Sequence, residues 1–145
     1  MGSRLCVRGV LPMGAPVERV WAVFADVDRW RTWDWLGSAD ARWIHGRPWT
    51  PGAGLRVGHR PFTFDCVVTE SEPGRRVVWA GRGLWFHGTL VFEFLPRGAD
   101  DTHVRTTEVF TGRGAPLLRP LIRWFWAYQL SALRRACRRR DPVHR

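Results

Sequence analysis

The order of the secondary-structure patterns along the chain constrains its fold more than any other feature of the sequence. Between residues 41 and 111, prolines and glycines divide the chain into six short segments, a regular spacing that is typical of an antiparallel meander. The segments predicted as strands are 41–46, 54–60, 62–70, 76–81, 84–95 and 102–111. A first strand is predicted over residues 4–11, where Leu5 and Val7 alternate with Arg4, Cys6 and Arg8.

Helical spacing flanks this set of strands on both sides. Behind Pro16, apolar residues recur at the helical period over residues 16–25, and a second short helical or looped piece holds Trp30, Trp33 and Trp35. Residues 117–139 carry two apolar stripes at helical spacing, which are Leu121–Phe125–Tyr128–Ala132 and Ile122–Trp126–Gln129–Leu133. Because only a sheet offers enough apolar surface to cover this broad face, the sequence predicts an α+β fold. A curved antiparallel sheet of about seven strands grips the long C-terminal helix, with two short helices after strand 1, in one domain over residues 1–145.

The net charge of +10 first suggests a nucleic-acid partner, but its distribution does not favour one. Residues 134–145 carry six Arg and one Asp, so half of the positive excess lies at the chain end. Cations at a helix C-terminus are favoured by the helix dipole, and the alternative is a patch for an acidic carrier protein, anionic lipid or nucleic acid. All 23 basic residues are Arg, and with no Lys or Asn the composition indicates a GC-rich bacterial genome.

Several classes of protein and site are not supported by the sequence. No run of about 18 apolar residues could span a membrane, and the N-terminus lacks the apolar core of a signal peptide. Cys6, Cys66 and Cys137 are odd in number and far apart, which favours neither disulfides nor a metal site and suggests a reducing cytoplasm. Without clustered His/Cys ligands, a phosphate-binding loop or a dinucleotide-binding motif, we expect no cofactor.

The two-residue period of the strands predicts which side chains face the interior of the sheet. The inward set contains one carboxylate, one histidine and many aromatic rings. Its members are Leu55, Val57, His59, Phe62, Phe64, Cys66, Val68, Val77, Trp79, Phe86, Gly88, Leu90, Phe92, Phe94, Val104, Thr106, Glu108 and Phe110.

Three residues of this interior are candidates for proton transfer. Burial of Glu108 among apolar groups would raise its pKa and suit it to an enolisable carbon, whereas the alternative is a structural ion pair with Arg113 or a helix arginine. His59 is the only histidine predicted to face inward and could pair with Glu108 or Tyr128, or lie partly exposed at a strand end. Tyr128, the only tyrosine, is placed on a stripe that faces the sheet, where its hydroxyl could hold a substrate carbonyl or satisfy a backbone group.

Several local motifs, taken in order, resemble the START/Bet v 1-like helix-grip superfamily (SRPBCC) of polyketide cyclase/dehydrase and lipid-transport proteins. They are APVERVW (15–21), DVDRW (26–30) with Trp33, EPGRRVVW (72–79), FEFLP (92–96), THVR (102–105) and EVFTG (108–112). The resemblance implies a deep apolar cavity between the sheet and the C-terminal helix. Members bind lipids, polyketides, plant hormones or other bulky compounds, and some catalyse aldol cyclisation or dehydration. The superfamily has no common catalytic residue, so none is carried over.

On this basis we expect a binding site for a bulky hydrophobic small molecule, with Glu108 as base and His59 or Tyr128 polarising a carbonyl in a cyclase or dehydratase reaction. The alternatives are a non-catalytic carrier or sensor and a basic docking module for nucleic acid or anionic membrane. Trp30, Trp33 and Trp35 would form flat walls where such folds open, or belong to the core. The other expected ligand contacts are Phe64, Cys66, Trp79, Phe86, Leu90, Phe92, Thr106, Phe110, Phe125 and Gln129.

Overall fold

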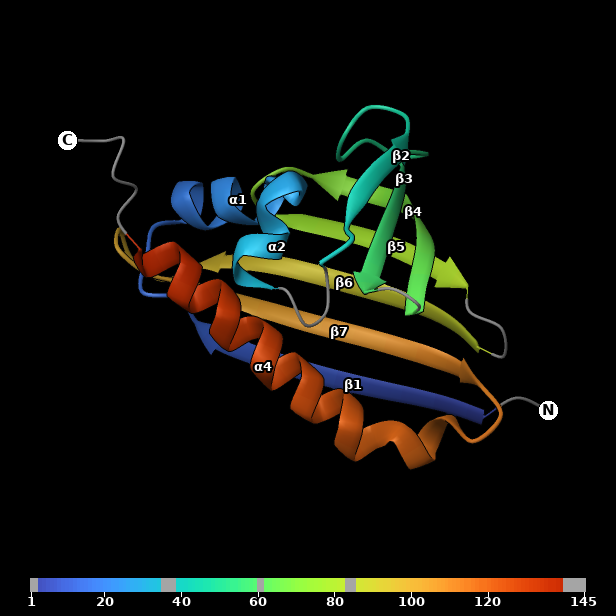
Figure 1. Cartoon of the computed structure of the whole chain (residues 1–145). Helices are drawn as coiled ribbons and strands as arrows, with labels where there is room; N and C mark the ends of the chain where they lie inside the picture. The colour runs from blue at the N-terminus through green and yellow to red at the C-terminus, as the bar shows by residue number, and fades with distance from the viewer. Residues whose placement is uncertain (1–2, 35–38, 60–61, 83–85, 140–145) are drawn as a thin grey trace.

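A computed structural model describes residues 3–34, 39–59, 62–82 and 86–139, with the backbone alone at Ser3, His59, Phe62 and Phe86 (Figure 1). Strand β1 (Ser3–Pro12) is followed by helix α1 (Val17–Ala25), the 3-10 turn η1 (Val27–Arg29) and the short helix α2 (Trp30–Trp33). The next six strands are β2 (Arg42–His45), β3 (Gly54–His59), β4 (Phe62–Glu72), β5 (Arg76–Arg82), β6 (Phe86–Pro96) and β7 (Thr102–Gly112). The 3-10 turn η2 (Ala115–Leu118) then leads into the long helix α4 (Arg119–Arg138).

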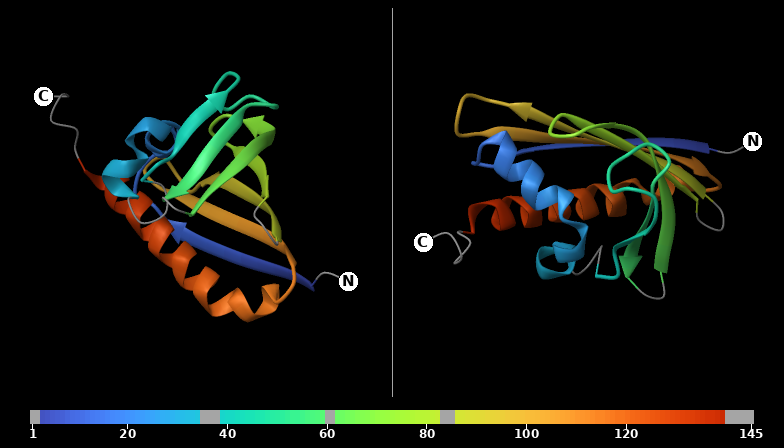
Figure 2. Two further views of the ribbon diagram at one scale, coloured as in Figure 1. Left: turned by 45° about the vertical axis from the view of Figure 1, so that its right-hand side comes forward. Right: turned by 90° about the horizontal axis from the view of Figure 1, so that it is seen from above.

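The seven strands form one sheet in the order β1-β7-β6-β5-β4-β3-β2, and every neighbouring pair is antiparallel. The first strand therefore closes against the last, while the rest follow one another as a meander. Figures 1 and 2 show the sheet curving round, with α4 lying along its concave side and α1 and α2 near one end of that helix. The predicted α+β helix-grip architecture is confirmed.

Cross-strand register places apolar side chains in rows across the concave face. One row joins Val68, Trp79, Leu90, Glu108 and Val7 on five successive strands. All of these except Glu108 are buried, and the glutamate is partly buried. The neighbouring row on one side contains Cys66, Gly81, Gly88, Phe110 and Leu5, and the row on the other contains Val77, Phe92, Thr106 and Gly9.

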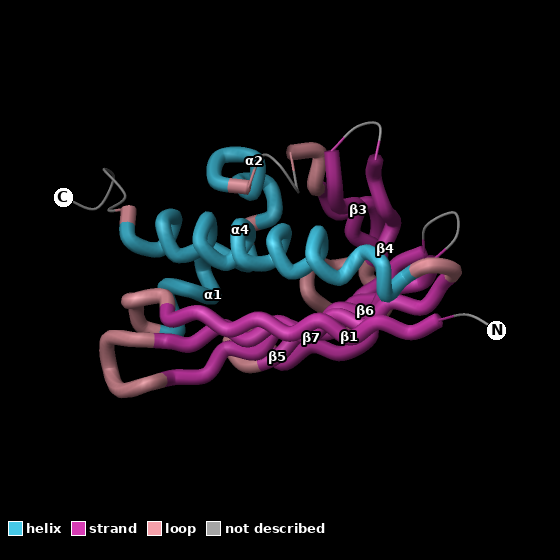
Figure 3. The backbone as a smooth tube through the Cα atoms, turned by 90° about the horizontal axis from the view of Figure 1, so that it is seen from below, coloured by secondary structure: helices cyan, strands magenta, loops and turns pink. Residues whose placement is uncertain are grey.

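Helix α4 packs on this face through Trp126, Leu130, Leu133 and Cys137, which recur at the helical period and are buried. A glycine in β1 lets the helix come close, because a Cβ at Gly9 would lie 3.3 Å from Leu130 Cδ1. The tube view in Figure 3 shows α4 lying across the strands as a separate layer. Within the described part of the chain, no helix is long and apolar enough to cross a membrane.

The predicted stripe Leu121–Phe125–Tyr128–Ala132 does not face the sheet as a unit. Ala132 is buried, but Leu121 is 62% exposed and Tyr128 is half-buried with its ring stacked on Trp124, which is 58% exposed. The prediction of a sheet-facing Leu121 is wrong because the second stripe, which contains Trp126, determines how the helix is turned. A residue five positions before Trp126 falls on the opposite side of the helix.

A cluster of aromatic rings fills the end of the fold between α1, α2 and the sheet. Its centre is Phe24, whose ring lies 5.1 Å from Trp49, 4.7 Å from Phe92 and 5.7 Å from Trp30. Trp49 has a positive φ of 56° and donates its indole N–H to the Ala25 carbonyl at 2.9 Å, which fixes the β2–β3 turn against α1. Much of the tryptophan excess therefore builds a core.

Candidate functional site

Glu108 on β7 is the carboxylate that the concave face presents to α4. Its neighbours across the sheet are Leu90 on β6 and Val7 on β1. The indole Nε1–H of Trp126, from the buried side of α4, donates a hydrogen bond to Glu108 Oε2. Among the described residues, no ion pair joins Glu108 to Arg113 or to any arginine of α4, so the carboxylate is held by a neutral donor in apolar surroundings.

This environment changes the acidity of the Glu108 side chain. Burial raises the pKa of Glu108 to about 7 because the charged form loses its hydration, while the hydrogen bond from Trp126 acts in the opposite direction. Near neutral pH the group is therefore populated in both protonation states. Such a group can both accept and return a proton in one reaction cycle.

Beside Glu108, two facing glycines shape the floor of the concave face. Gly81 on β5 pairs with Gly88 on β6, and neither carries a side chain into the space above. A Cβ at Gly81 would lie 2.7 Å from Cys66 Sγ, and one at Gly88 would lie 3.2 Å from Phe110 Cε1. The Cys66 thiol therefore lies over Gly81, and the Phe110 ring lies over Gly88. Together these four residues form an apolar floor on the concave face.

Cys66 lies on the same concave face, and its thiol is not activated as a nucleophile. Burial raises the pKa of its thiol to about 12, and the negative charges of Asp65 and Glu108 add to the effect. The thiol therefore stays protonated, and a protonated thiol is a weak nucleophile.

Several other expected ligand contacts lie around Glu108. Phe110 and Thr106 flank it on the same face of β7, and Phe92 meets the Trp126 ring edge-on at 5.5 Å. Trp79 stacks on Phe92 at 5.3 Å, which joins this region to the aromatic cluster. Thr106 is buried, and its Oγ1 has no hydrogen-bond partner among the described residues.

The residues expected on α4 take different positions. Gln129 is buried on the side that faces the sheet, and Phe125 is half-buried with its ring edge-on to Trp126 at 5.5 Å. Tyr128 stacks on Trp124 at 6.1 Å, on the side of the helix that carries Leu121. The geometry therefore brings Gln129 and Phe125 towards Trp126, and Tyr128 away from it.

The tryptophans expected at an opening also differ from one another. Trp30 is buried and donates its indole N–H to the Phe24 carbonyl at 2.7 Å, which makes it part of the core. Trp33 is half-buried, and its buried Nε1 has no hydrogen-bond partner within the described ranges. Phe64 is half-buried on β4. Trp35 and the side chains of His59 and Phe86 lie outside the described residues.

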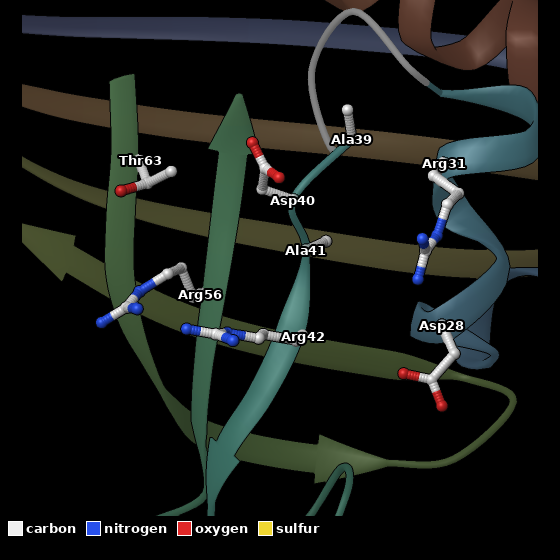
Figure 4. A pocket seen from close by; sticks show the side chains of 8 residues that line it. All are labelled: Asp28, Arg31, Ala39, Asp40, Ala41, Arg42, Arg56 and Thr63. Carbon is white, nitrogen blue, oxygen red and sulfur yellow. The ribbon is translucent and has the colours of Figure 1, made fainter. Parts of the chain in front are cut away.

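A separate polar hollow of about 230 Å³ lies between α2 and strands β2–β4. Figure 4 shows the guanidinium groups of Arg42 and Arg56 side by side on neighbouring strands. Arg56 Nε lies 2.7 Å from Asp65 Oδ1, and this hydrogen bond holds the pKa of Asp65 below its usual value. The residues that line the hollow are Asp28, Arg31, Ala39, Asp40, Ala41, Arg42, Arg56 and Thr63.

With this geometry established, comparison with protein-family models matches residues 6–139 to the family described as polyketide cyclase / dehydrase and lipid transport. The chain belongs to this family. The match spans the whole fold from β1 to the end of α4 and confirms the resemblance to the START/Bet v 1-like (SRPBCC) superfamily. A search among curated proteins found no significant match.

Solved structures of other helix-grip proteins have the same fold as this polyketide cyclase/dehydrase family member. A norcoclaurine synthase from Thalictrum flavum is 12% identical with a TM-score of 0.73, covering 97% of each chain. A START superfamily protein from Mycobacterium smegmatis is 17% identical with a TM-score of 0.72, over 91% of this chain and 96% of the other. DynU16, from the dynemicin biosynthetic locus, is 23% identical with a TM-score of 0.71, over 90% of this chain and 46% of the other.

Sequence reasoning about this family member missed two parts of the candidate site. Trp126 was placed on a sheet-facing stripe but not assigned to the site, although a tryptophan on such a stripe opposite an inward glutamate is a signal for a hydrogen bond. The facing pair Gly81 and Gly88 depends on strand register, which the sequence alone does not provide. Both the Trp126–Glu108 hydrogen bond and the Gly81–Gly88 pairing depend on contacts between different strands and helices.

Proposed function

We propose that this protein binds a bulky hydrophobic small molecule, polyketide-like or otherwise polycyclic and aromatic, against the concave face beside Glu108. We further propose that Glu108 carries out proton transfer in a cyclisation or dehydration of that molecule. The observation that carries the proposal is the Glu108 carboxyl group, with a pKa of about 7 and a neutral indole donor, among apolar side chains.

The proposed chemistry uses the two protonation states of this one group. The Glu108 carboxylate removes a proton from a carbon next to a substrate carbonyl, and the enolate attacks a second carbonyl carbon of the same molecule. The protonated Glu108 then returns the proton to the resulting alkoxide, so that the ring closes with no change in redox state. In a dehydration, the Glu108 carboxylate again removes a proton from the carbon next to the carbonyl, and the protonated group then gives that proton to the departing hydroxyl, so that a carbon–carbon double bond forms and water leaves.

The apolar side chains around Glu108 would give the ligand its binding energy. Phe110, Leu90 and Phe92 offer flat or branched surfaces on the sheet, and Phe125 and Gln129 offer one apolar and one polar surface on α4. Trp33, Trp79, Cys66, Phe64 and Thr106 extend these walls. Burying apolar ligand surface contributes roughly 25 cal/mol per Å², which favours bulky ligands.

The comparisons support this proposal at the level of the family. The family description includes cyclases, dehydrases and lipid transport, all of which handle hydrophobic molecules. One of the structural neighbours, norcoclaurine synthase, was crystallised with dopamine and hydroxybenzaldehyde, which are small aromatic compounds. Another neighbour comes from a biosynthetic locus.

Binding can be tested with N-phenyl-1-naphthylamine, a neutral aromatic probe whose fluorescence rises in apolar surroundings. We expect saturable binding that weakens when Phe110→Ala removes a wall of the site, and that is unchanged in the matched control Val10→Ala, an exposed residue on β1. Native mass spectrometry would identify any co-purified ligand. Equal binding by the parent and Phe110→Ala would contradict this location for the site.

The chemical step needs a separate test. Polyketide-like polycarbonyl compounds are incubated with the parent and with Glu108→Gln, and cyclised products are followed by mass spectrometry. We expect the variant to keep its affinity and to lose turnover by about 10²–10⁴-fold, as is usual for a general acid–base group. Tyr128→Phe and His59→Gln test the two partners expected from the sequence. Turnover that survives in Glu108→Gln contradicts catalysis by this group, and binding without turnover in the parent favours a carrier.

A further inference from the structure

The 3-10 turn η2 and the start of α4 carry apolar side chains that are exposed. Leu117 is 85% exposed, Leu121 is 62% exposed and Trp124 is 58% exposed, and Leu118 adds a fourth exposed apolar residue. Leu121 and Trp124 are three positions apart, whereas the sheet-facing residues Trp126 and Leu130 lie on the opposite side. We call Leu117, Leu118, Leu121 and Trp124 the apolar ridge.

The apolar ridge lies in a segment of one charge sign. From residue 109 to residue 140 the sequence contains eight Arg and neither Asp nor Glu. Arg113, Arg119 and Arg123 are exposed around the ridge. Arg4 is exposed on the neighbouring end of β1, where it pairs with Thr111 at the end of β7. The surface around the ridge is therefore both apolar and cationic.

We propose that the apolar ridge and its flanking arginines dock this protein onto an anionic lipid bilayer. A row of Leu and Trp with Arg beside it is the composition of a helix that lies in the membrane interface. Arginines near such a surface are attracted to anionic headgroups, and their long stems let the guanidinium reach the phosphate level. The site lies apart from Glu108, so this inference is independent of the proposed ligand and reaction.

The shape and the charge of this surface favour a bilayer over other occupants. Figures 1 and 2 show the start of α4 at the outside of the fold, beyond the edge strand β1. An outward ridge enters a fluid lipid layer without needing a matching groove. If the same surface of a second copy docked here, the arginines of the two copies would face and repel one another. Residues 109–140 contain no acidic residue that could pair with those arginines.

Sedimentation of the full chain with lipid vesicles tests the inference. We expect binding to phosphatidylcholine vesicles that contain phosphatidylglycerol, weakening as salt rises, and little binding to vesicles of phosphatidylcholine alone. The double variant Leu117→Ser/Leu121→Ser should weaken binding by at least about tenfold, since two exposed leucines that would enter the lipid are lost. Arg123→Gln should weaken it by about fivefold and reduce its salt dependence.

Matched controls distinguish binding through the apolar ridge from a general effect of exposed apolar or charged residues. Val10→Ser changes an apolar residue of β1 that is 58% exposed, Arg97→Gln changes an exposed arginine of the β6–β7 turn, and both should bind vesicles like the parent. Circular dichroism and N-phenyl-1-naphthylamine binding check that each variant is folded.

Three outcomes overturn the inference. The first is the absence of vesicle binding by the parent. The second is binding that survives in Leu117→Ser/Leu121→Ser but is lost in Arg134→Gln/Arg135→Gln, which points to the charged helix end. The third is a dimer in light scattering that the leucine variant dissociates, which points to a second copy.

Discussion

The indole N–H of Trp126 on α4 donates a hydrogen bond to the carboxylate of Glu108 on β7. This bond joins α4 to the concave face of the sheet. In the cross-strand row that contains Leu90 and Val7, Glu108 is the one residue with a side chain that can carry a charge. The protonation state of Glu108 and the packing of α4 are therefore coupled. The proposed proton transfer and the stability of the fold can be tested through the same pair of residues.

Trp126→Phe should raise the pKa of Glu108 further above its present value of about 7. The indole N–H stabilises the charged carboxylate, and a hydrogen bond to a charged group is worth enough to shift the pKa by about one unit. NMR titration of the side-chain carboxyl carbons measures this directly. Trp124→Phe is the matched control because that indole lies on the exposed side of α4. A pKa that stays the same or falls would contradict the role assigned to Trp126.

Glu108→Gln should raise the free energy of unfolding relative to the parent by more at pH 8 than at pH 5. The pKa of Glu108 is higher in the folded chain than the ordinary value of 4.5, so the unfolded chain loses its proton first as pH rises. The parent therefore loses stability between about pH 4.5 and about pH 7, and the loss is complete above that window. The variant cannot ionise and escapes a loss on the order of 2 kcal/mol. Urea denaturation of the parent and the variant at pH 5 and at pH 8 gives the four free energies of unfolding. If the variant and the parent differ by the same amount at both pH values, the prediction is refuted.

Gly81→Ala should destabilise the fold, and Cys66→Ala should relieve most of that cost. The added methyl group would lie 2.7 Å from Cys66 Sγ but 3.8 Å from Cys66 Cβ, so the clash involves the sulfur alone. Overpacking of this kind costs roughly 1–3 kcal/mol. A double-mutant cycle by chemical denaturation measures the coupling between the two sites. Simple additivity of the two single changes would show that the Cys66 thiol does not occupy this space.

Arg19→Gln should loosen the C-terminal end of α4. The Arg19 side chain on α1 donates hydrogen bonds to the carbonyl oxygens of Cys137 and Arg139, which the helix itself leaves unsatisfied. We expect a loss of about 1–2 kcal/mol in stability and faster amide hydrogen exchange in the last helical turn. Arg29→Gln is the control, since Arg29 is exposed and its Nε lies 3.6 Å from Asp26 Oδ2. Unchanged exchange at the helix end would contradict this anchoring role.

The sequence predicts the strands and their inward faces well because both depend on local patterns. Leu55 lies between Gly54 and Arg56, and Val104 lies between His103 and Arg105, so the alternation indicates the buried side. The facing of α4 could not be predicted in the same way, since two stripes compete and only contact with the sheet decides between them. For that reason Leu121 was expected on the wrong side, while the facing of Gln129 was expected correctly.

The candidate site shows the same division between local and long-range information. Glu108 was recognised from its place in a strand, yet its partner Trp126 comes from a different element, and no local pattern connects the two. Trp30 was expected either as a ligand wall or as part of the core, and it lies in the core, where it packs against Phe24 and Trp49. The role of His59 stays a prediction.

The facing glycines of β5 and β6 also limit how this protein can diverge. The Cys66 thiol occupies the space above Gly81, and the Phe110 ring occupies the space above Gly88, so a side chain added at either glycine has to displace that neighbour. Among relatives that keep this floor, positions 66 and 81 should covary, as should positions 88 and 110. A new ligand shape would then require two linked substitutions, and single changes on the floor would be removed by selection for stability.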